Sequence, residues 1–378
     1  MVATRTLSEV DARDCVLLSA APWCASRLDF RKRNVHWRLR RIVQIIYAVS
    51  FKRLRIAGLA ERGLSPFTTP LIRAATRIPA DLYVAHQPAA LPAAAIAARR
   101  HRGVYAFDAE DFHLGECPAD DRYDDHRRLI RAAEERYLPG CAYITAASPG
   151  IADAYVEAYG IERPTVLLNV FPRAEAPTAP TPFGQAAPRP SAYWFSQTIG
   201  PDRGIECALR AIALAKTRPH LHLRGSPAAG FLDHLTTIAR SIGVTDRLHI
   251  SSPAAPPKMA SLAAMHDVGL SCEPGHSANN KIALGNKLFT YLLAGLPVVL
   301  SDIPAHRHIA PHLGIAARLY PADDAAGLAR GLDIFFENPT MLAAARTKAF
   351  QIGQSRFNWD VEQIKLLKHL NPHARHYS

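Results

Sequence analysis

The chain has 378 residues, a formal net charge of +12, 48% hydrophobic residues and 21% charged residues. This composition is typical of globular proteins and excludes a largely disordered chain, and the length exceeds what one core usually serves, so we expect two domains. The longest apolar run, at 288–300, is too short to span a bilayer and is interrupted by Gly295 and Pro297.

The six cysteines are scattered singly and never form a C-x-x-C pair. We therefore expect neither a disulfide framework nor a structural zinc site, and the pattern favours a reducing compartment. The first residues contain no apolar signal-peptide core. We accordingly predict a cytoplasmic protein.

The positive charge is concentrated near the N-terminus. Between Arg27 and Arg55 there are ten basic residues and one acid, Asp29, which gives this stretch a charge of +9. Apolar residues within it recur at spacings of 4, 3, 4 and 3, which predicts a helix with one apolar stripe, formed by Val35, Leu39, Ile42, Ile46 and Val49.

Two environments suit this stripe, and they are compatible with each other. It can pack into the core of the first domain, or it can lie on an anionic membrane surface with Arg38, Arg40 and Arg41 on its flanks. The latter would make the protein peripheral at the inner membrane face. Because no aromatic-basic stacking pattern or nucleic-acid motif accompanies the charge, we expect no nucleic-acid partner.

The first half of the chain alternates short apolar runs with helical stretches at 91–100 and 127–137. The runs predict strands at 15–19, 82–85, 104–108 and 143–146. Titratable side chains follow two of these strands. We predict a catalytic group comprising His86, Asp108, Asp111 and His113, with Glu110 beside them, in which a carboxylate or an imidazole orients a substrate hydroxyl. The alternative is that the acids cap the next helix.

A proline-rich stretch divides the chain. Residues 172–190 hold six prolines in 19 positions and show no apolar periodicity, which is typical of an extended linker. We therefore predict an N-terminal domain at 1–171, a linker at 172–190 and a C-terminal domain at 191–350. At 351–378 we predict a helix that crosses back to the first domain, followed by a tail.

The second half repeats the alternation more clearly. Apolar runs predict strands at 192–195, 221–224, 248–250, 268–271 and 298–300, and helices are expected at 205–216, 231–242, 258–266 and 286–294. Strand–helix alternation of this kind predicts two Rossmann-like domains with parallel, doubly wound sheets. Ligands in such folds bind beyond the carboxyl ends of the strands, and two such domains would face a central cleft.

Two segments of the second half carry candidate binding residues. The stretch S-Q-T-I-G-P-D-R-G at 196–204 is a strand–turn–helix in which Gly200, Gly204 and Arg203 can hold an anion; alternatively, it is a plain turn with an exposed arginine. The stretch N-K-L-F-T-Y-L-L-A-G-L-P-V-V at 286–299 places Asn286 and Lys287 in the first turn of a helix. The helix dipole disfavours a cation there, so we expect an anionic partner for Lys287; the alternative is a solvated surface residue.

In their order and spacing these two segments resemble the C-terminal domain of GT-B glycosyltransferases, particularly glycosyltransferase family 4. Arg203 stands where the family commonly has a phosphate-binding lysine, and 286–299 is similar to the family's N-K-x-F-E-Y-x-x-A-G-x-P-V-V segment. The family's two glutamates, with seven residues between them, would fall at Ile282 and Thr290, and Glu273 is the acid that can replace one of them. The resemblance covers roughly residues 80–370.

The resemblance implies a glycosyltransferase that moves a sugar from a nucleotide-diphosphate sugar to a glycan or lipid-linked acceptor, with retention of configuration and without a metal or other cofactor. It implies that the donor is held by Gly200, Arg203, Gly204, Glu273, Asn286, Lys287 and Thr290. Two alternatives stay open: a nucleotide-sugar epimerase of the same fold, and a non-enzymatic nucleotide-sugar-binding protein.

Overall fold

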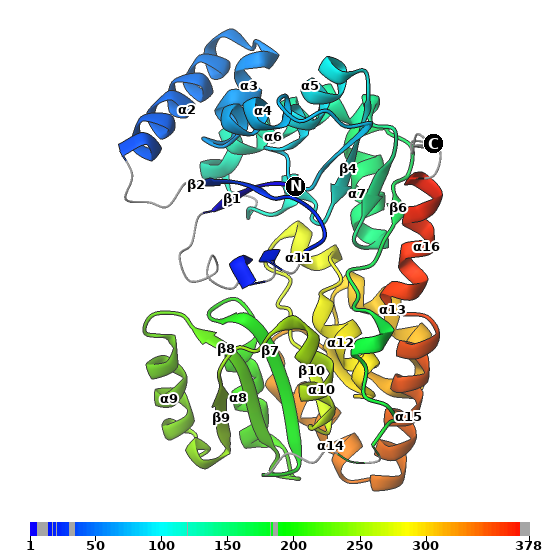
Figure 1. Cartoon of the computed structure of the whole chain (residues 1–378). Coiled ribbons are helices and arrows are strands. Elements are labelled where there is room, and N and C mark those ends of the chain that lie inside the picture. The colour runs from blue at the N-terminus through cyan, green and yellow to red at the C-terminus, as the bar shows by residue number, and fades with distance from the viewer. Residues whose placement is uncertain are drawn as a thin grey trace. The chain divides into compact units, whose positions relative to one another are not determined.

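The computed structural model describes residues 1–5, 14–16, 18–19, 21–29, 35–118, 120–181, 183 and 188–370 (Figure 1). The chain divides into two compact units. Unit 1 comprises Met1–Ala147, Ile151–Val166 and Lys368–Ser378, and unit 2 comprises Ser148–Gly150 and Leu167–Leu367. Within the described part of the chain, no helix is both long and apolar enough to cross a membrane. The basic residues at 31–33 and residues 371–378, the end of the predicted C-terminal segment at 351–378, lie outside the described residues.

Unit 1 contains a four-stranded parallel sheet with the order β3-β4-β5-β6, formed by Leu82–Ala85, Val104–Ala109, Ile144–Ala146 and Thr165–Val166. A separate parallel pair joins β1 (Val2–Arg5) to β2 (Ser26–Asp29). The helices are α2 (Val35–Leu54), α3 (Ala57–Leu64), α4 (Thr68–Ala75), α5 (Leu91–His101), α6 (Asp124–Tyr137) and α7 (Pro149–Tyr159).

The helix predicted from the apolar stripe is confirmed as α2, but the stripe does not enter the core. Its five residues are 48% to 70% exposed. The opposite face of α2 packs instead, since Phe51 joins Leu64 of α3 and Leu129 of α6 in a buried cluster, and Gln44 Nε2 donates to the Gly63 carbonyl at 2.8 Å. The prediction that the stripe packs in the core is therefore wrong, because the less apolar face of the helix made the tertiary contacts.

Unit 2 contains a six-stranded sheet with the order β12-β11-β10-β7-β8-β9, in which every pairing is parallel. Its strands are Ser191–Ile199 (β7), His220–Pro227 (β8), Leu248–Ser251 (β9), Val268–Ser271 (β10), Val298–Ser301 (β11) and Ala317–Tyr320 (β12). The chain runs outward from β7 to β9, then returns to the other side of β7 with β10. This reversal is the topological switch point of a doubly wound fold.

Successive side chains of each strand point to opposite faces of this sheet, and helices cover both faces. Trp194 lies in the core that α8 and α14 share, whereas the neighbouring ring of Tyr193 stacks on His266 and meets the ring of Tyr291 from α12. The helices of unit 2 are α8 (Ile205–Leu214), α9 (Phe231–Ser241), α10 (Met259–Ala264), α11 (Ala278–Ile282), α12 (Asn286–Ala294), α13 (Pro304–Leu313), α14 (Ala325–Phe336) and α15 (Pro339–Ser355).

The last helix, α16 (Trp359–Leu370), contains the boundary between the two units, after Leu367. In its unit 2 part, Glu362 accepts a hydrogen bond from the Leu168 amide at 3.0 Å. In its unit 1 part, His369 stacks on Tyr143 and lies 2.9 Å from the Thr165 hydroxyl. These contacts assign the end of α16 to unit 1. The domain boundaries, the linker at 172–190 and the crossing helix stay predictions.

Eight of the nine predicted strands are present, and the parallel α/β architecture is confirmed. The strand predicted at 15–19 is wrong, since Cys15, Val16, Leu18 and Ser19 are helical. A run of four or five apolar residues fits a strand and a helical turn equally well, so its periodicity does not decide between them.

Candidate active site

The carboxyl end of the unit 2 sheet brings together the two predicted donor-binding segments. The turn after β7 and the loop after β10 flank the switch point, where ligands bind in open α/β sheets. Gly204 has a φ of +69°, and a Cβ on it would clash with the Cys272 carbonyl oxygen. Only glycine allows the turn to lie this close to the end of β10.

The turn at 200–204 leads directly into α8, and its charged side chain is oriented by the preceding strand. Arg203 Nη1 donates to the Ser196 hydroxyl at 3.1 Å. Neither α8 nor α12 has a side chain that caps its N-terminus by a hydrogen bond. Amide groups at such a helix end, with an arginine beside them, suit a phosphate group.

Lys287 and Glu273 form a buried ion pair at the same edge. Lys287 Nζ lies 2.9 Å from Glu273 Oε1, and the two side chains are only 11% and 15% exposed. Burial alone would raise the pKa of Glu273, but Lys287, with smaller contributions from His306 and Arg203, holds it below its ordinary value. The expected anionic partner of Lys287 is confirmed, and the solvated-surface alternative is wrong.

The remaining predicted donor contacts differ in accessibility. Asn286 is partly exposed in the first turn of α12, whereas Gly200 is buried. Thr290 is fully buried and donates its hydroxyl to the Asn286 carbonyl at 3.0 Å, within its own helix. Roles for all three in donor binding stay predictions.

Sequence reasoning missed a buried polar group that supports Glu273. The Ser301 hydroxyl donates to the Glu273 carbonyl at 2.7 Å, and His306 Nδ1 lies 2.8 Å from the Ser301 carbonyl oxygen. His306 Nε2 is 3.3 Å from the Ser271 hydroxyl. These residues come from β10, β11 and α13, so no contiguous motif marks them. The signal that remained in the sequence was a serine ending each of two neighbouring strands.

Unit 1 carries its own polar group at the carboxyl end of its sheet. His86 follows β3 and Asp108 lies near the end of β4, and His86 Nδ1 is 3.0 Å from Asp108 Oδ2. Thr145, from β5, donates its hydroxyl to the other carboxylate oxygen of Asp108. Parallel strands end at one edge, which explains why residues 22 and 37 positions apart meet here.

The electrostatics of this group favour a charged pair. The hydrogen bond to Asp108 raises the pKa of His86 above its ordinary value, although burial opposes this. Burial would raise the pKa of Asp108, but the hydrogen bonds from His86 and Thr145 hold it below its ordinary value. Burial and the charge of Asp108 raise the pKa of Glu110.

The other two predicted catalytic residues are placed differently. His113 is 2% exposed, and its Nδ1 lies 2.8 Å from the Tyr155 hydroxyl and 3.4 Å from Glu134 Oε1. Asp111 is partly exposed, and its carbonyl accepts from Tyr155 at 3.4 Å. The structure therefore brings His86 and Asp108 together and places His113 in a buried network. Catalytic roles for these residues stay predictions.

Among the described residues, one cluster has ligand types and spacing that could hold a metal ion. The ligand atoms of His86, Asp108 and Glu110 all lie within 4.8 Å of one another. The sequence predicted no metal, and nothing in this geometry tests that expectation, because a histidine–carboxylate ion pair has the same arrangement.

The fold is shared with solved glycosyltransferase structures. Anabaena HepE, solved in complex with UDP and glucose, is 17% identical with a TM-score of 0.72, and the match covers 98% of this chain and 99% of HepE. A glycosyltransferase from Rickettsia africae is 12% identical with a TM-score of 0.65, over 99% and 90% of the two chains. This confirms the predicted GT-B fold.

A third similar structure is the sucrose-phosphate synthase from Thermosynechococcus elongatus, 12% identical with a TM-score of 0.65, matched over 85% of this chain and 79% of the synthase. No protein-family model and no curated protein sequence matches the chain. At these identities the similarity extends to the fold alone.

Proposed function

We propose that the protein is a glycosyltransferase that moves a sugar from a nucleotide-diphosphate sugar to an acceptor hydroxyl. The observation that carries this is the convergence of the uncapped N-terminus of α8, Arg203 and the Lys287–Glu273 pair at the switch point of unit 2. HepE, which shares the fold, has been solved with UDP-glucose. We therefore propose UDP as the nucleotide of the donor.

The chemistry follows from where the charge develops. When the bond from the sugar to the diphosphate breaks, negative charge grows on the leaving oxygens, and preorganised donors lower the barrier. The α8 amides and the Arg203 guanidinium supply such donors. Glu273 holds Lys287 at this edge, and from there the ammonium group of Lys287 can turn to the diphosphate. These groups support transfer of a hexose without a metal ion.

Unit 1 supplies candidate acceptor chemistry in this proposal. His86 and Asp108 are hydrogen-bonded at a strand edge, which is the arrangement in which a carboxylate orients an imidazole. In this role His86 would hold or accept the proton of an acceptor hydroxyl. The acceptor class, a glycan or a lipid-linked sugar, and retention of configuration are part of the proposal, as is a peripheral position at the cytoplasmic membrane face.

Arg203→Ala tests the donor site. Removing a charge-assisted hydrogen bond costs about 1.5–3 kcal/mol, so the Kd for UDP measured by calorimetry should rise about 10- to 150-fold. Arg210→Ala is the matched control, because Arg210 is exposed on the same helix, α8. Equal UDP affinity in the Arg203→Ala and Arg210→Ala variants would contradict the donor site.

The reaction itself can be tested with UDP-glucose. In the absence of an acceptor a transferase should leave the sugar unisomerised, with slow release of UDP by hydrolysis. Formation of an isomeric UDP-sugar would instead establish an epimerase. UDP binding with neither hydrolysis nor isomerisation, and no transfer to any sugar or lipid acceptor, would favour the non-enzymatic binding protein.

A further inference from the structure

The carboxyl end of the unit 1 sheet holds three side chains that can ligate a metal ion. His86 directly follows β3, Asp108 lies near the end of β4, and Glu110 directly follows β4. One ligand atom from each side chain lies within 4.8 Å of the ligand atoms of the other two. The Glu110 amide donates to the Asp108 carbonyl at 3.2 Å, so the chain turns sharply after β4. This turn keeps both carboxylates at the same edge as His86.

The contact between His86 and Asp108 has the separation of two ligands of one ion. His86 Nδ1 is 3.0 Å from Asp108 Oδ2. Two atoms that each lie about 2.1 Å from an ion are about 3.0 Å apart at a right angle and about 3.4 Å apart in a tetrahedron. A hydrogen bond between the two side chains has the same length, but it does not explain Glu110. Among the described residues, no donor forms a hydrogen bond with the Glu110 carboxylate, which nevertheless lies beside the pair.

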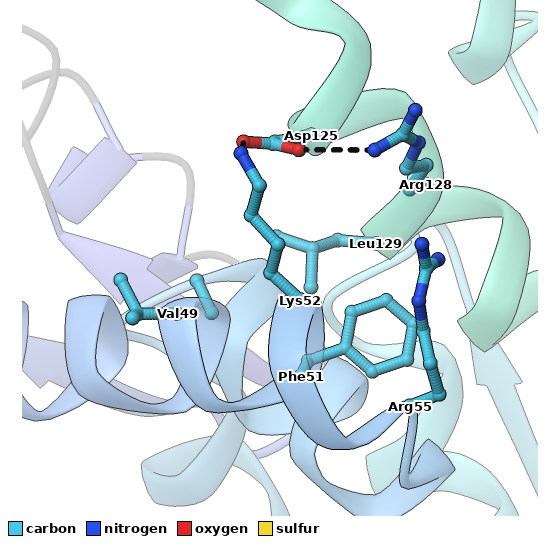
Figure 2. A pocket seen from close by; sticks show the side chains of 8 residues that line it. Val49, Phe51, Lys52, Arg55, Asp125, Arg128 and Leu129 are labelled. Atoms are coloured by element: carbon cyan, nitrogen blue, oxygen red, sulfur yellow. Dashed lines mark hydrogen bonds and ion pairs between the residues drawn. The ribbon is translucent and has the colours of Figure 1, made fainter.

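Several other carboxylates of unit 1 have basic partners. Where α2 meets α6, Asp125 Oδ2 lies 2.8 Å from Lys52 Nζ and its Oδ1 lies 3.4 Å from Arg128 Nη1 (Figure 2). Asp108 and Glu110 differ, since within the described part of the chain neither has a lysine or arginine nitrogen within 4.0 Å. This lack of a basic partner stands out in a chain with 45 lysine and arginine residues. Two carboxylates this close repel each other, and a cation held between them would remove the repulsion.

The surroundings of Asp108 match those of a metal ligand. The hydroxyl of Thr145, a buried residue of β5, donates to Asp108 Oδ1 and so leaves Oδ2 to face His86. Metal-ligating carboxylates are commonly oriented by such outer hydrogen bonds. The His86 side chain is 61% exposed, so an ion bound to it would have solvent access. Three protein ligands would then leave a coordination position for water or a substrate oxygen.

The types of the ligand atoms indicate which class of ion fits. Magnesium and calcium ions take oxygen ligands, whereas an imidazole nitrogen suits first-row transition metals and zinc. Affinity for such a site rises from manganese toward zinc. We propose that His86, Asp108 and Glu110 bind a divalent transition-metal ion, with Zn²⁺ bound more tightly than Mn²⁺.

This inference is independent of glycosyl transfer and stands even if the proposed reaction does not. The groups assigned to the donor diphosphate are all in unit 2, and metal binding is measured without any sugar nucleotide. An ion on Nδ1 would fix the proton of the neutral imidazole on Nε2. His86 could then not accept the proton of an acceptor hydroxyl, so metal binding and that proposed role exclude each other at any one moment.

The test uses the full chain, freed of metal by chelator and dialysis and titrated with zinc chloride in a calorimeter. Because the chain has 17 histidines, the zinc affinity of each variant is compared with that of the parent protein. Glu110→Gln and His86→Ala should each weaken the tightest zinc site at least about tenfold, the lower end of the loss seen when an outer hydrogen-bond partner is removed. Both side chains are exposed, so neither change should alter the fold.

The matched control is His234→Ala in unit 2. His234 Nε2 lies 3.5 Å from Glu206 Oε1, which makes an exposed histidine–carboxylate pair, and no third ligand completes it among the described residues. The zinc affinity of this variant should stay within about twofold of the parent. In the parent, manganese chloride should bind more weakly than zinc chloride, and magnesium chloride more weakly still.

Three results would overturn the proposal. Equal zinc affinity in the parent, Glu110→Gln and His86→Ala would show that the three side chains form an ion pair and no metal site. Magnesium bound as tightly as zinc would exclude the imidazole as a ligand. In crystals soaked with zinc, anomalous scattering should place an ion between the three side chains, and zinc found only at other histidines would contradict the site.

Discussion

Lys287 shows how one residue combines structural and chemical demands. It lies in the first turn of α12, where the helix dipole disfavours a cation, and its Nζ lies 5.6 Å from the centre of the Trp194 ring. Glu273 compensates for this unfavourable position through the 2.9 Å ion pair. Because the pair is largely buried, each partner depends on the other, and an incoming diphosphate would compete with Glu273 for the lysine.

Lys287→Met should therefore lower the free energy of unfolding by about 3 kcal/mol, because it leaves a buried carboxylate without its partner. Adding Glu273→Gln should recover part of the loss, since the amide carries no charge. Urea unfolding measures both, with Lys281→Met at an exposed position as the control. A Lys287→Met variant as stable as this control would show that the ion pair contributes nothing.

Asp108→Asn tests the hydrogen bond between His86 and Asp108 in unit 1. Asp108 is the main cause of the raised pKa of His86, so the amide should lower that pKa to its ordinary value or below. NMR titration of the imidazole reports this, and His86→Gln assigns the signal. An unchanged pKa would show that the contact is absent in solution. If His86 acts on the acceptor, transfer rate should fall while UDP affinity stays constant.

At the scale of elements, helix α2 is fixed by a glycine contact on its inner face. Gly63 and Gly58 both lie in α3, yet only Gly63 approaches α2 closely, and a Cβ on Gly58 would meet nothing within 4 Å. Substitutions at these two glycines therefore separate the effect of the α2–α3 contact on stability from the effect of helix propensity.

Gly63→Ala should destabilise the protein by about 1–2 kcal/mol, because overpacking against the Ala48 backbone exceeds the gain in helix propensity. Gly58→Ala should instead be neutral or stabilise by up to about 1 kcal/mol. Thermal or urea unfolding distinguishes them. If both substitutions stabilised the protein equally, the close packing of α2 on α3 would be contradicted.

At the scale of the whole molecule, a row of histidines in unit 2 connects stability to pH. His222 stacks on His249 and contacts His266, whose ring in turn stacks on Tyr193 with centroids 4.2 Å apart. Burial lowers the pKa of His222 to about 4 and that of His266 to about 3. Both imidazoles are therefore neutral in the folded protein at pH values where the unfolded chain binds their protons.

The unfolded state binds more protons below a pH of about 6.5, so stability should be complete above that pH and fall as the pH drops toward the folded pKa values. Each histidine contributes a slope of up to about 1.4 kcal/mol per pH unit. His266→Phe should lower the number of protons taken up on unfolding by about one between pH 6.5 and 4.5. The slope of the free energy of unfolding against pH, from urea unfolding, measures this number. If this variant kept the pH slope of the parent protein, His266 would be excluded as a cause of that slope.

The sequence by itself determined the elements and the class of fold. Strands at 82–85 and 268–271 and the helix at 286–294 were predicted at their observed bounds, because short β-branched runs and helical apolar spacing are local properties of the chain. The motif at 286–299 also placed Lys287 correctly at a helix start and predicted its anionic partner. Local chemistry was sufficient for these inferences.

Only the tertiary structure decided which residues meet and which face of a helix is buried. Ser301 and His306 support Glu273 from different elements, and the structure joins His86 to Asp108 but places His113 in a separate buried network. The stripe of α2 has ideal spacing for a core, yet Phe51 and Ala48 face α3 instead. Periodicity identifies an apolar face, but packing depends on the shape of its neighbours, and that information is distributed over the whole chain.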